Sequence, residues 1–293
     1  METIEWLHYD SFSNQPNKGN PAGVVFLEYS LPLQQQQRIA KIINFNETVF
    51  ITHSTCADFK FKFFAPSSEM DFCGHALLAG AVAILDKKKT LKNSLSIETN
   101  VGIVSITISK NKQVTMTQKE PLFTKFSGSI SDIADLLSIK ITDIDNSFPI
   151  VYGNTGTWTL IVPIKHLSSF KEMTPLTKQF PKILTEFPAS SIHPICLETR
   201  SQEADMYSRH FSGAYTGAIE DAVTGSAAGV MGAYYSTYIS EQKNNEFIQL
   251  HMEQGYELKR EGIVLVNLLK QNDIFTVSIT GTATFVTSSH ISI

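Results

Sequence analysis

The sequence predicts an α+β protein with two similar lobes, each a curved, mostly antiparallel sheet or barrel around a central helix. Three observations support this fold class. Apolar and polar residues alternate in strand-like segments, two helical segments are apolar on every side, and several short motifs occur twice in the same order. The chain has 293 residues, close to the length at which one hydrophobic core gives way to two domains.

The strand-like alternation is clearest at Phe59, Phe61 and Phe63, which are separated by charged residues. Such a period of two is typical of a strand with one buried face. The same pattern recurs in residues 97–108, around an Asn100-Val101-Gly102 turn, and in residues 274–280 and 282–287.

Two kinds of helix are expected. An amphipathic helix should begin near Pro32 and include Leu33 and Ile43, and Ser131 should cap a shorter one that runs through Leu137. Residues 75–85 and 226–239 are instead rich in Ala and Gly and apolar all round, as in helices enclosed by other elements. These two segments are the predicted central helices.

An internal repeat supports the two lobes. Matching motifs occur in one order in both halves, at offsets that drift from 134 to 151 residues: Gly19-Asn20 with Gly153-Asn154, Ala57-Asp58 with Ala204-Asp205, Phe64 with Phe211, Asp71 with Asp221, and Gly74-His75-Ala76 with Gly225-Ser226-Ala227. The Ala-Asp match places Pro194 at the position of Glu47. We expect an N-terminal lobe of residues 1–118, completed by a strand at about 280–293, and a C-terminal lobe of residues 119–279.

Composition excludes several classes of protein. The formal net charge is −4 and no basic stripe is present, which argues against a nucleic-acid partner. The longest apolar run, Ala76 to Leu85, is too short to span a membrane. Cys56, Cys73 and Cys196 form no CxxC pair, which favours a reducing compartment over a disulfide framework or a zinc site. With no signal peptide at the N-terminus, a cytoplasmic location is expected.

The two glycine-led helix starts are candidate binding sites. A helix N-terminus leaves N–H groups unpaired and carries partial positive charge, and a glycine there lets a ligand approach closely. Gly74–His75 and Gly225–Ser226 could therefore bind a substrate carboxylate across a cleft between the lobes. The alternative is structural, with Asp71, Asp221 and Ser226 capping helices or loops and His75 a structural histidine.

Glu47 is the candidate acid/base. It lies in the segment Asn44-Phe45-Asn46-Glu47-Thr48-Val49-Phe50, where a helix tail gives way to a strand. Apolar neighbours should desolvate the carboxylate and raise its pKa towards neutrality. The alternative is a solvent-facing glutamate at a strand edge.

Four motifs in order resemble those of the phenazine-biosynthesis isomerase family (PhzF-like). They are Gly19-Asn20-Pro21-Ala22-Gly23-Val24, the Glu47 segment, Asp71-Phe72-Cys73-Gly74-His75-Ala76, and the run from Glu220 to Gly229. Arg209-His210-Phe211 and Gln254-Gly255 extend the resemblance almost to the C-terminus. The sequence departs from the family pattern at Asn46, where serine is frequent, and at Ala222, where proline is frequent.

The resemblance implies the fold of diaminopimelate epimerase, with the active site between the lobes. It also implies that Glu47 shuttles a proton and that His75, Asp221 and Ser226 position the substrate, to which we add Asn20, Gly74 and Gly225. No metal, no organic cofactor and a homodimer are implied. The chain is therefore expected to be a cofactor-independent isomerase that moves a proton within a small carboxylate-bearing substrate. The N–H groups at the two helix starts would stabilise the negative charge that develops on the substrate.

Two alternatives stay open at this point. An amino-acid epimerase or racemase with two thiol bases is disfavoured, because Thr224 stands where the second lobe would need a counterpart of Cys73, which is expected to be a packing residue. The other alternative is a catalytically silent protein that binds small acids. Nucleotide binding is excluded because no GxGxxG or P-loop is present. Substrate, pathway and stereochemistry are beyond the sequence.

Overall fold

A computed structural model describes residues 3–241, 246–271 and 274–292 of the chain. The chain divides into two compact units. The first comprises Met1–Met116 together with Thr280–Ile293, and the second comprises Thr117–Ile279. Within the described ranges, no helix has the length and the apolar character needed to cross a bilayer.

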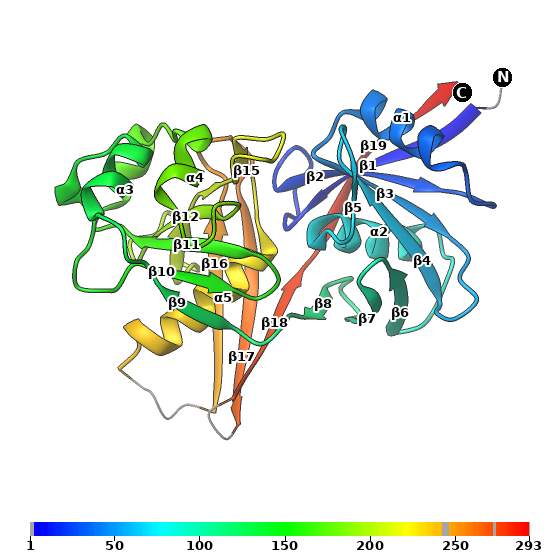
Figure 1. Ribbon diagram of the computed structural model, residues 1–293. Coiled ribbons are helices and arrows are strands. Elements are labelled where there is room, and N and C mark those ends of the chain that lie inside the picture. The colour runs from blue at the N-terminus through cyan, green and yellow to red at the C-terminus, as the bar shows by residue number, and fades with distance from the viewer. Residues whose placement is uncertain (1–2, 242–245, 272–273, 293) are drawn as a thin grey trace. The chain divides into compact units, whose positions relative to one another are not determined.

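The first unit is a curved sheet around helix α2 (Figure 1). Every residue of α2 from His75 to Ile84 is buried, which explains why this helix is apolar on all sides. Its elements are β1 (Thr3–Ser11), β2 (Asn20–Phe26), α1 (Leu33–Ile43), β3 (Glu47–Thr52), β4 (Phe59–Phe64), β5 (Glu69–Met70), α2 (Gly74–Asp86), β6 (Ser94–Thr99), β7 (Gly102–Ile108), β8 (Val114–Thr117) and β19 (Ala283–Ser292).

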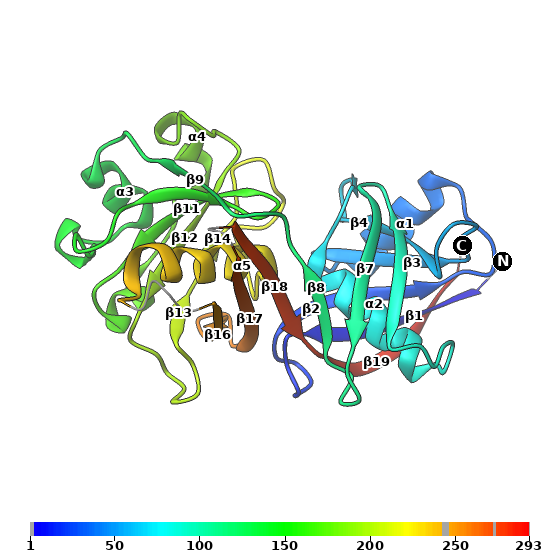
Figure 2. The same cartoon turned by 90° about the horizontal axis from the view of Figure 1, so that it is seen from below.

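The second unit encloses helix α5, which packs against β10, β16 and β17 (Figure 2). Its helices and strands are β9 (Leu122–Lys125), α3 (Ile130–Leu137), β10 (Val151–Asn154), β11 (Trp158–Pro163), α4 (Phe180–Ile183), β12 (Ser191–Cys196), β13 (Met206–Ser208), β14 (His210–Phe211), β15 (Glu220–Asp221), α5 (Gly225–Tyr234), β16 (Phe247–Gln254), β17 (Gly262–Gln271) and β18 (Ile274–Gly281). Short 3₁₀ helices cover Ile141–Asp143, Leu167–Glu172 and Thr177–Gln179.

The two units share one order and sense of strand pairing. In the first, β19, β1, β2, β3 and β4 are neighbours, and β4 continues to β6 and β7. In the second, β9, β10, β11, β12 and β13 are neighbours, and β13 continues to β16 and β17. The third and fourth strands, β2 with β3 and β11 with β12, are parallel in both units, as are β4 with β6 and β13 with β16, whereas the other pairs are antiparallel. The predicted fold class is confirmed.

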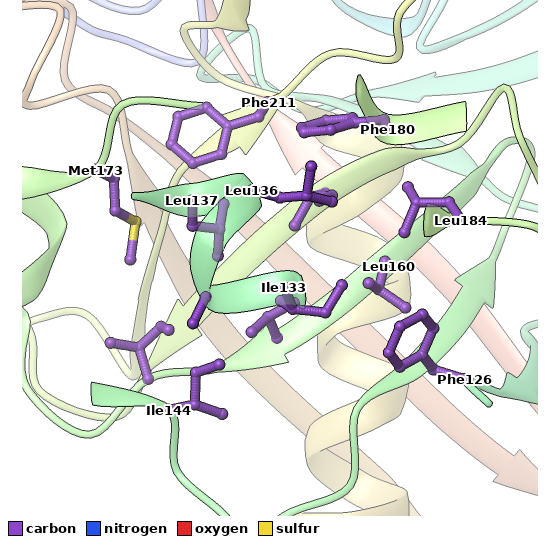
Figure 3. Close-up of a cluster of buried hydrophobic side chains, with 14 of the residues drawn as sticks. Phe126, Ile133, Leu136, Leu137, Ile144, Leu160, Met173, Phe180, Leu184 and Phe211 are labelled. Atoms are coloured by element: carbon purple, nitrogen blue, oxygen red, sulfur yellow. The ribbon is translucent and has the colours of Figure 1, made fainter. Parts of the chain in front are cut away.

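Each unit has its own apolar core. In the second unit, Ile133, Leu136 and Leu137 of α3 pack with Leu160 of β11 and with Phe180 (Figure 3). In the first, a cluster beneath α1 joins Ile39 to Phe50 and Phe64. The expected apolar stripe of α3 is thus buried, whereas in α1 Ile39 and Ile43 are buried and Leu33, its first residue, is 50% exposed.

Two helix details differ from the sequence prediction. The N-cap of α3 is Ser129, whose side chain accepts a hydrogen bond from the N–H of Ser131, so Ser131 lies inside the helix. The second central helix keeps α geometry only to Tyr234, and Tyr235–Ile239 form a π-helical turn. The spacing of apolar residues in the sequence indicates a helix but specifies neither its exact first residue nor a change from α to π geometry at its end.

The strand register corrects three matches of the predicted repeat. Glu47 pairs with Ala22 on the parallel neighbour strand and Ser191 pairs with Thr159, so the counterpart of Glu47 is Ser191 and not Pro194. Gly153–Asn154 lie in β10, which corresponds to β1, whereas Asn20 begins β2, which corresponds to β11. Asp221 pairs with His210 as Met70 pairs with Phe63, so Asp221 corresponds to Met70 and not to Asp71. Loops of unequal length between the strands displaced these matches.

Candidate active site

Glu47 is placed by the short connection between α1 and β3. Asn44 ends α1 in the left-handed conformation, with φ of 59°, a conformation that asparagine tolerates better than most residues. Phe45 then packs against Trp6 and His8 of β1, with ring centroids 5.7 and 4.4 Å away. The chain is therefore anchored on both sides of the reversal, and Glu47 becomes the first residue of β3.

Glu47 and His75 are in direct contact. Glu47 Oε2 lies 3.1 Å from His75 Nε2, and the side chains are 16% and 7% exposed. The carboxylate is thus mostly enclosed but still reachable by a small molecule. His75 is held in the first turn of α2, and Ser11 Oγ donates a 2.7 Å hydrogen bond to its carbonyl.

Asn20 sets the orientation of the His75 ring. The side-chain amide nitrogen of Asn20 lies 3.2 Å from His75 Nδ1, and Asn20 is fully buried. This contact holds the ring at its Nδ1 edge, and Nε2 is the ring nitrogen that contacts Glu47. Gly19 permits the approach to Asn20, because it has φ of +70° and a Cβ there would lie 2.2 Å from the Ser11 carbonyl oxygen.

Cys73 is the third group of this cluster. Its Sγ lies 3.4 Å from His75 Nδ1, and the residue is buried, as expected of a packing residue. Burial raises the pKa of the Cys73 thiol, so it is protonated at neutral pH. Burial alone would lower the pKa of His75, but the negative charges of a Cys73 thiolate and of the Glu47 carboxylate raise it well above its usual value.

Two chemical capacities follow from this arrangement. Cys73, the N-cap of α2, makes no side-chain capping bond, so the first-turn N–H groups of α2 are not capped by that side chain. An anionic group at this end would meet the partial positive charge of the helix next to a carboxylate base. In addition, ligand atoms of Glu47, Cys73 and His75 all lie within 4.8 Å of one another, a set that could hold a metal ion.

The corresponding end of α5 in the second unit is organised by hydrogen bonds. Thr224 Oγ1 donates to Asp221 Oδ2 over 2.6 Å. Gln254, which is buried, donates to the Asp221 carbonyl over 2.7 Å and accepts from the Thr224 N–H over 3.2 Å. The loop between Asp221 and Thr224 is therefore clamped by one glutamine. Gly225 and Ser226 accept bonds through their carbonyls, from Gln118 and Thr155 respectively.

Behind Asp221, a buried ion pair ties β14 to β15. Arg209 donates to both carboxylate oxygens of Glu220, over 2.8 and 2.6 Å, and its Nη1 group donates to the carbonyls of Phe170 and Met173. The two side chains are 8% and 9% exposed. This fork holds the strand that carries Asp221.

A histidine pair lies on the same strands. His193 and His210 face each other with Nδ1 atoms 3.2 Å apart, so one ring donates and the other accepts. Burial lowers the pKa of His210 to about 4. Burial also lowers the pKa of His193, and the positive charge of a protonated His210 would lower it further. Both rings are therefore neutral at pH 7.

Within the first unit, the structure brings Glu47, His75, Asn20 and the Gly74 helix start together. Within the second unit it brings Asp221 beside the Gly225–Ser226 helix start. Sequence reasoning missed the contact of Cys73 with His75, although its place at the N-cap two residues before His75 could have indicated it. It also missed the clamp by Gln254, whose only signal was its place in a family motif.

The fold belongs to a class that includes epimerases. A solved structure of a hydroxyproline epimerase from Agrobacterium vitis aligns with 99% of this chain and 93% of that one, with a TM-score of 0.61 at 9% identity, which is a likeness of fold alone. A solved PhzF-family protein of Bacillus anthracis aligns over 100% of both chains, with a TM-score of 0.96 and 43% identity. The class is that of enzymes with the diaminopimelate epimerase-like fold.

The particular family follows from the sequence matches. Residues 9–289 match the family described as phenazine biosynthesis-like protein. "Uncharacterized isomerase YfhB" of Bacillus subtilis is 39% identical over 289 residues, 97% of each chain. Trans-2,3-dihydro-3-hydroxyanthranilate isomerase of Pseudomonas chlororaphis is 28% identical over 279 residues, 92% of this chain and 93% of that one. The chain belongs to the phenazine biosynthesis-like family, and it is an isomerase with a small-molecule substrate.

Proposed function

We propose that this isomerase moves a proton within a small carboxylate-bearing substrate and that Glu47 is the acid/base. The observation that carries this proposal is the 3.1 Å contact of Glu47 Oε2 with His75 Nε2, beside the start of α2. A general base must be enclosed, oriented and still reachable, and Glu47 meets all three conditions. The relative from Pseudomonas chlororaphis is named for a carboxylate-bearing substrate, which agrees with an anion at this helix end.

The proposed reaction transfers one proton and leaves the redox state unchanged. Ionised Glu47 takes a proton from a substrate carbon, and the electron pair of the broken C–H bond shifts into the neighbouring unsaturated system. The protonated Glu47 then returns its proton to another carbon of the same molecule. His75, through Nε2–H, keeps the carboxylate oriented, and the N–H groups of Gly74 and His75 stabilise the negative charge that develops.

The remaining site assignments stay predictions. Asn20 acts on the substrate through the His75 ring that it orients. Asp221, Gly225 and Ser226 are assigned to substrate binding on geometry within the second unit alone. A homodimer and a cytoplasmic location also stay predictions, and light scattering during gel filtration measures the first.

Deuterium uptake tests the proposal. The protein is incubated in heavy water with candidate unsaturated and amino carboxylic acids, and NMR detects deuterium on carbon. We expect uptake with the wild type and a loss of about 10²–10⁴-fold in Glu47→Gln, the usual contribution of a general acid/base. Glu69→Gln is the matched control, because Glu69 is another half-buried glutamate of this unit and should leave the uptake rate unchanged.

Two outcomes would contradict the proposal. Undiminished uptake in Glu47→Gln would remove Glu47 from the mechanism. Saturable binding of an acid without any exchange in the wild type would favour a silent binding protein. A two-thiol racemase is not supported, because the residue corresponding to Cys73 is Thr224, whose hydroxyl is bonded to Asp221.

A further inference from the structure

We propose that Thr224 and Gln254 are positioning residues for substrate binding, because together they orient the carboxylate of Asp221. The inference rests on the proposed function for one point, the assignment of Asp221 to substrate binding. It gives a role in the reaction to two side chains that the sequence did not place in the site. All three residues lie within the second unit.

A directed chain of hydrogen bonds joins the three side chains. Gln254 Nε2 donates to Thr224 Oγ1 over 3.3 Å, and Thr224 Oγ1 donates in turn to Asp221 Oδ2 over 2.6 Å. An ionised carboxylate can only accept, so the hydroxyl proton points to Asp221 and the hydroxyl oxygen accepts from the amide. The chain therefore holds one carboxylate oxygen of Asp221 in a fixed direction.

The two ends of the Gln254 amide are not interchangeable. Its Oε1 accepts from the Thr224 backbone N–H over 3.2 Å, and its Nε2 donates to the Asp221 carbonyl over 2.7 Å. A reversed amide would bring two donors together at Thr224 and two acceptors together at Asp221. Gly255, with φ of +94°, permits the close approach of this strand end, because a Cβ there would lie 2.8 Å from the Ala222 carbonyl oxygen.

The Thr224 hydroxyl does not have its usual structural role. Thr224 is the N-cap of α5, where a threonine side chain typically accepts a bond from an N–H of the first helical turn, but it makes no capping bond. The two contacts of Gln254 with the backbone already close the loop. The hydroxyl contact is additional, and its effect is on the direction of the Asp221 carboxylate.

Burial changes along the chain of hydrogen bonds. Gln254 is 3% exposed, whereas Thr224 and Asp221 are partly exposed. The chain therefore begins at a fixed interior group and ends at a carboxylate that a small molecule can reach. A polar group already held in one rotamer loses less conformational entropy when a ligand binds. Loss of the chain should weaken substrate binding and leave proton transfer at Glu47 unaffected.

Deuterium exchange over a range of acid concentrations tests this role, with the acid that exchanges fastest in the wild type. It separates KM from kcat. Thr224→Val keeps the approximate shape of the side chain but removes the hydroxyl, so KM should rise about 10- to 100-fold at unchanged kcat, the effect of one lost hydrogen bond to a charged group. Thr224→Ser keeps the hydroxyl and should retain a KM near the wild-type value.

Gln254→Glu tests the direction of the chain. It replaces the amide donor with an acceptor, so the Thr224 hydroxyl can turn to the new carboxylate and away from Asp221. KM should rise as in Thr224→Val, and the double variant should show no further rise, because both changes act on one chain. Gln249→Glu is the matched control, since Gln249 is an exposed glutamine of the same strand, β16, and its KM should not change.

Circular dichroism verifies that each variant is folded. An unchanged KM in Thr224→Val, or an equal rise in Thr224→Val and Thr224→Ser, overturns the positioning role. Calorimetry with anthranilic acid, a small acid with an amino donor, measures binding without turnover. Binding that weakens in Thr224→Val and recovers in Thr224→Ser, while the wild type exchanges no deuterium with any acid, supports the positioning role and counts against the proposed function alone.

Discussion

The starts of the two central helices invite direct comparison, because α2 and α5 follow corresponding strands in units of one topology. At the start of α2, Cys73, His75 and nearby Glu47 are titratable groups in mutual contact. At the start of α5, the corresponding residues are Thr224, Ser226 and Ser191, all neutral. Ser191 is engaged with Thr159 over 2.7 Å, and Thr224 with Asp221.

The difference shows how one topology can be specialised in two ways. In the first unit, the carboxylate faces an imidazole whose ring is oriented by Asn20, so a proton can be held or moved. In the second unit, the single carboxylate of the loop is bonded to the hydroxyl of Thr224, and Gln254 clamps the backbone around it. Groups bonded to one another in this way are suited to holding a ligand in place rather than to exchanging protons with it.

The largest effect on the exchange rate should come from replacing Glu47 with serine, the residue found at the corresponding position of the second unit, Ser191. Glu47→Ser should reduce the exchange rate about 10²–10⁴-fold, because the general base is removed. The free energy of unfolding should change far less, since a partly exposed carboxylate is replaced by a small polar group. Exchange measured by NMR and urea unfolding separate the two effects. Activity retained in Glu47→Ser would break the comparison.

The next largest effect, on the free energy of unfolding, should come from two ion pairs at corresponding positions of the two units. Arg209–Glu220 is bidentate and buried, whereas Lys62–Glu69, on the corresponding strands, spans 3.4 Å with 23% and 27% exposure. Glu220→Gln should destabilise the protein by about 3–5 kcal/mol, because it leaves a buried guanidinium without its charge partner. Glu69→Gln should cost about 0–1 kcal/mol. Urea unfolding of both variants measures the ratio, and equal losses would contradict the assignment.

A smaller effect should appear with pH. The pKa of His210 is lowered by burial to about 4, below the value of about 6.5 expected in the unfolded chain. Between these values the unfolded chain binds more protons, so stability should fall as the pH drops from 6.5 towards 4. At pH 5 the loss from His210 should be roughly 1–2 kcal/mol.

His210→Phe tests this pH effect with a matched shape, since the corresponding residue of the first unit is Phe63. The variant should lose less stability than the wild type between pH 7 and pH 5. Urea unfolding at both pH values gives the difference. Identical pH dependence in the two proteins would show that His210 does not contribute.

The smallest effect is expected at Ser191. Ser191→Ala removes the hydrogen bond to Thr159 and should cost about 0.5–1.5 kcal/mol of stability, the usual net value of such a bond. The exchange rate should stay unchanged, because the base lies at the corresponding position of the other unit. Loss of exchange in Ser191→Ala comparable to that in Glu47→Ser would remove the functional asymmetry.

Local patterns were sufficient for most of the fold. The alternation at Phe59, Phe61 and Phe63 predicted β4, and the Ala/Gly-rich segments predicted α2 and α5, since period and side-chain size report directly on burial. The repeated Gly-led helix starts indicated two units of one kind. Matches between the halves failed wherever a loop length differed, as with Pro194 for Ser191.

The sequence by itself therefore determined the fold class, the family and the identity of the candidate base, because these depend on local periodicity and on motifs of adjacent residues. Only the tertiary structure decided which groups touch. The contact of Glu47 with His75, the approach of Asn20 to the same ring, and the clamp of Gln254 on the Asp221 loop join residues far apart in the chain. Such contacts depend on strand register and loop length, which a local pattern does not specify.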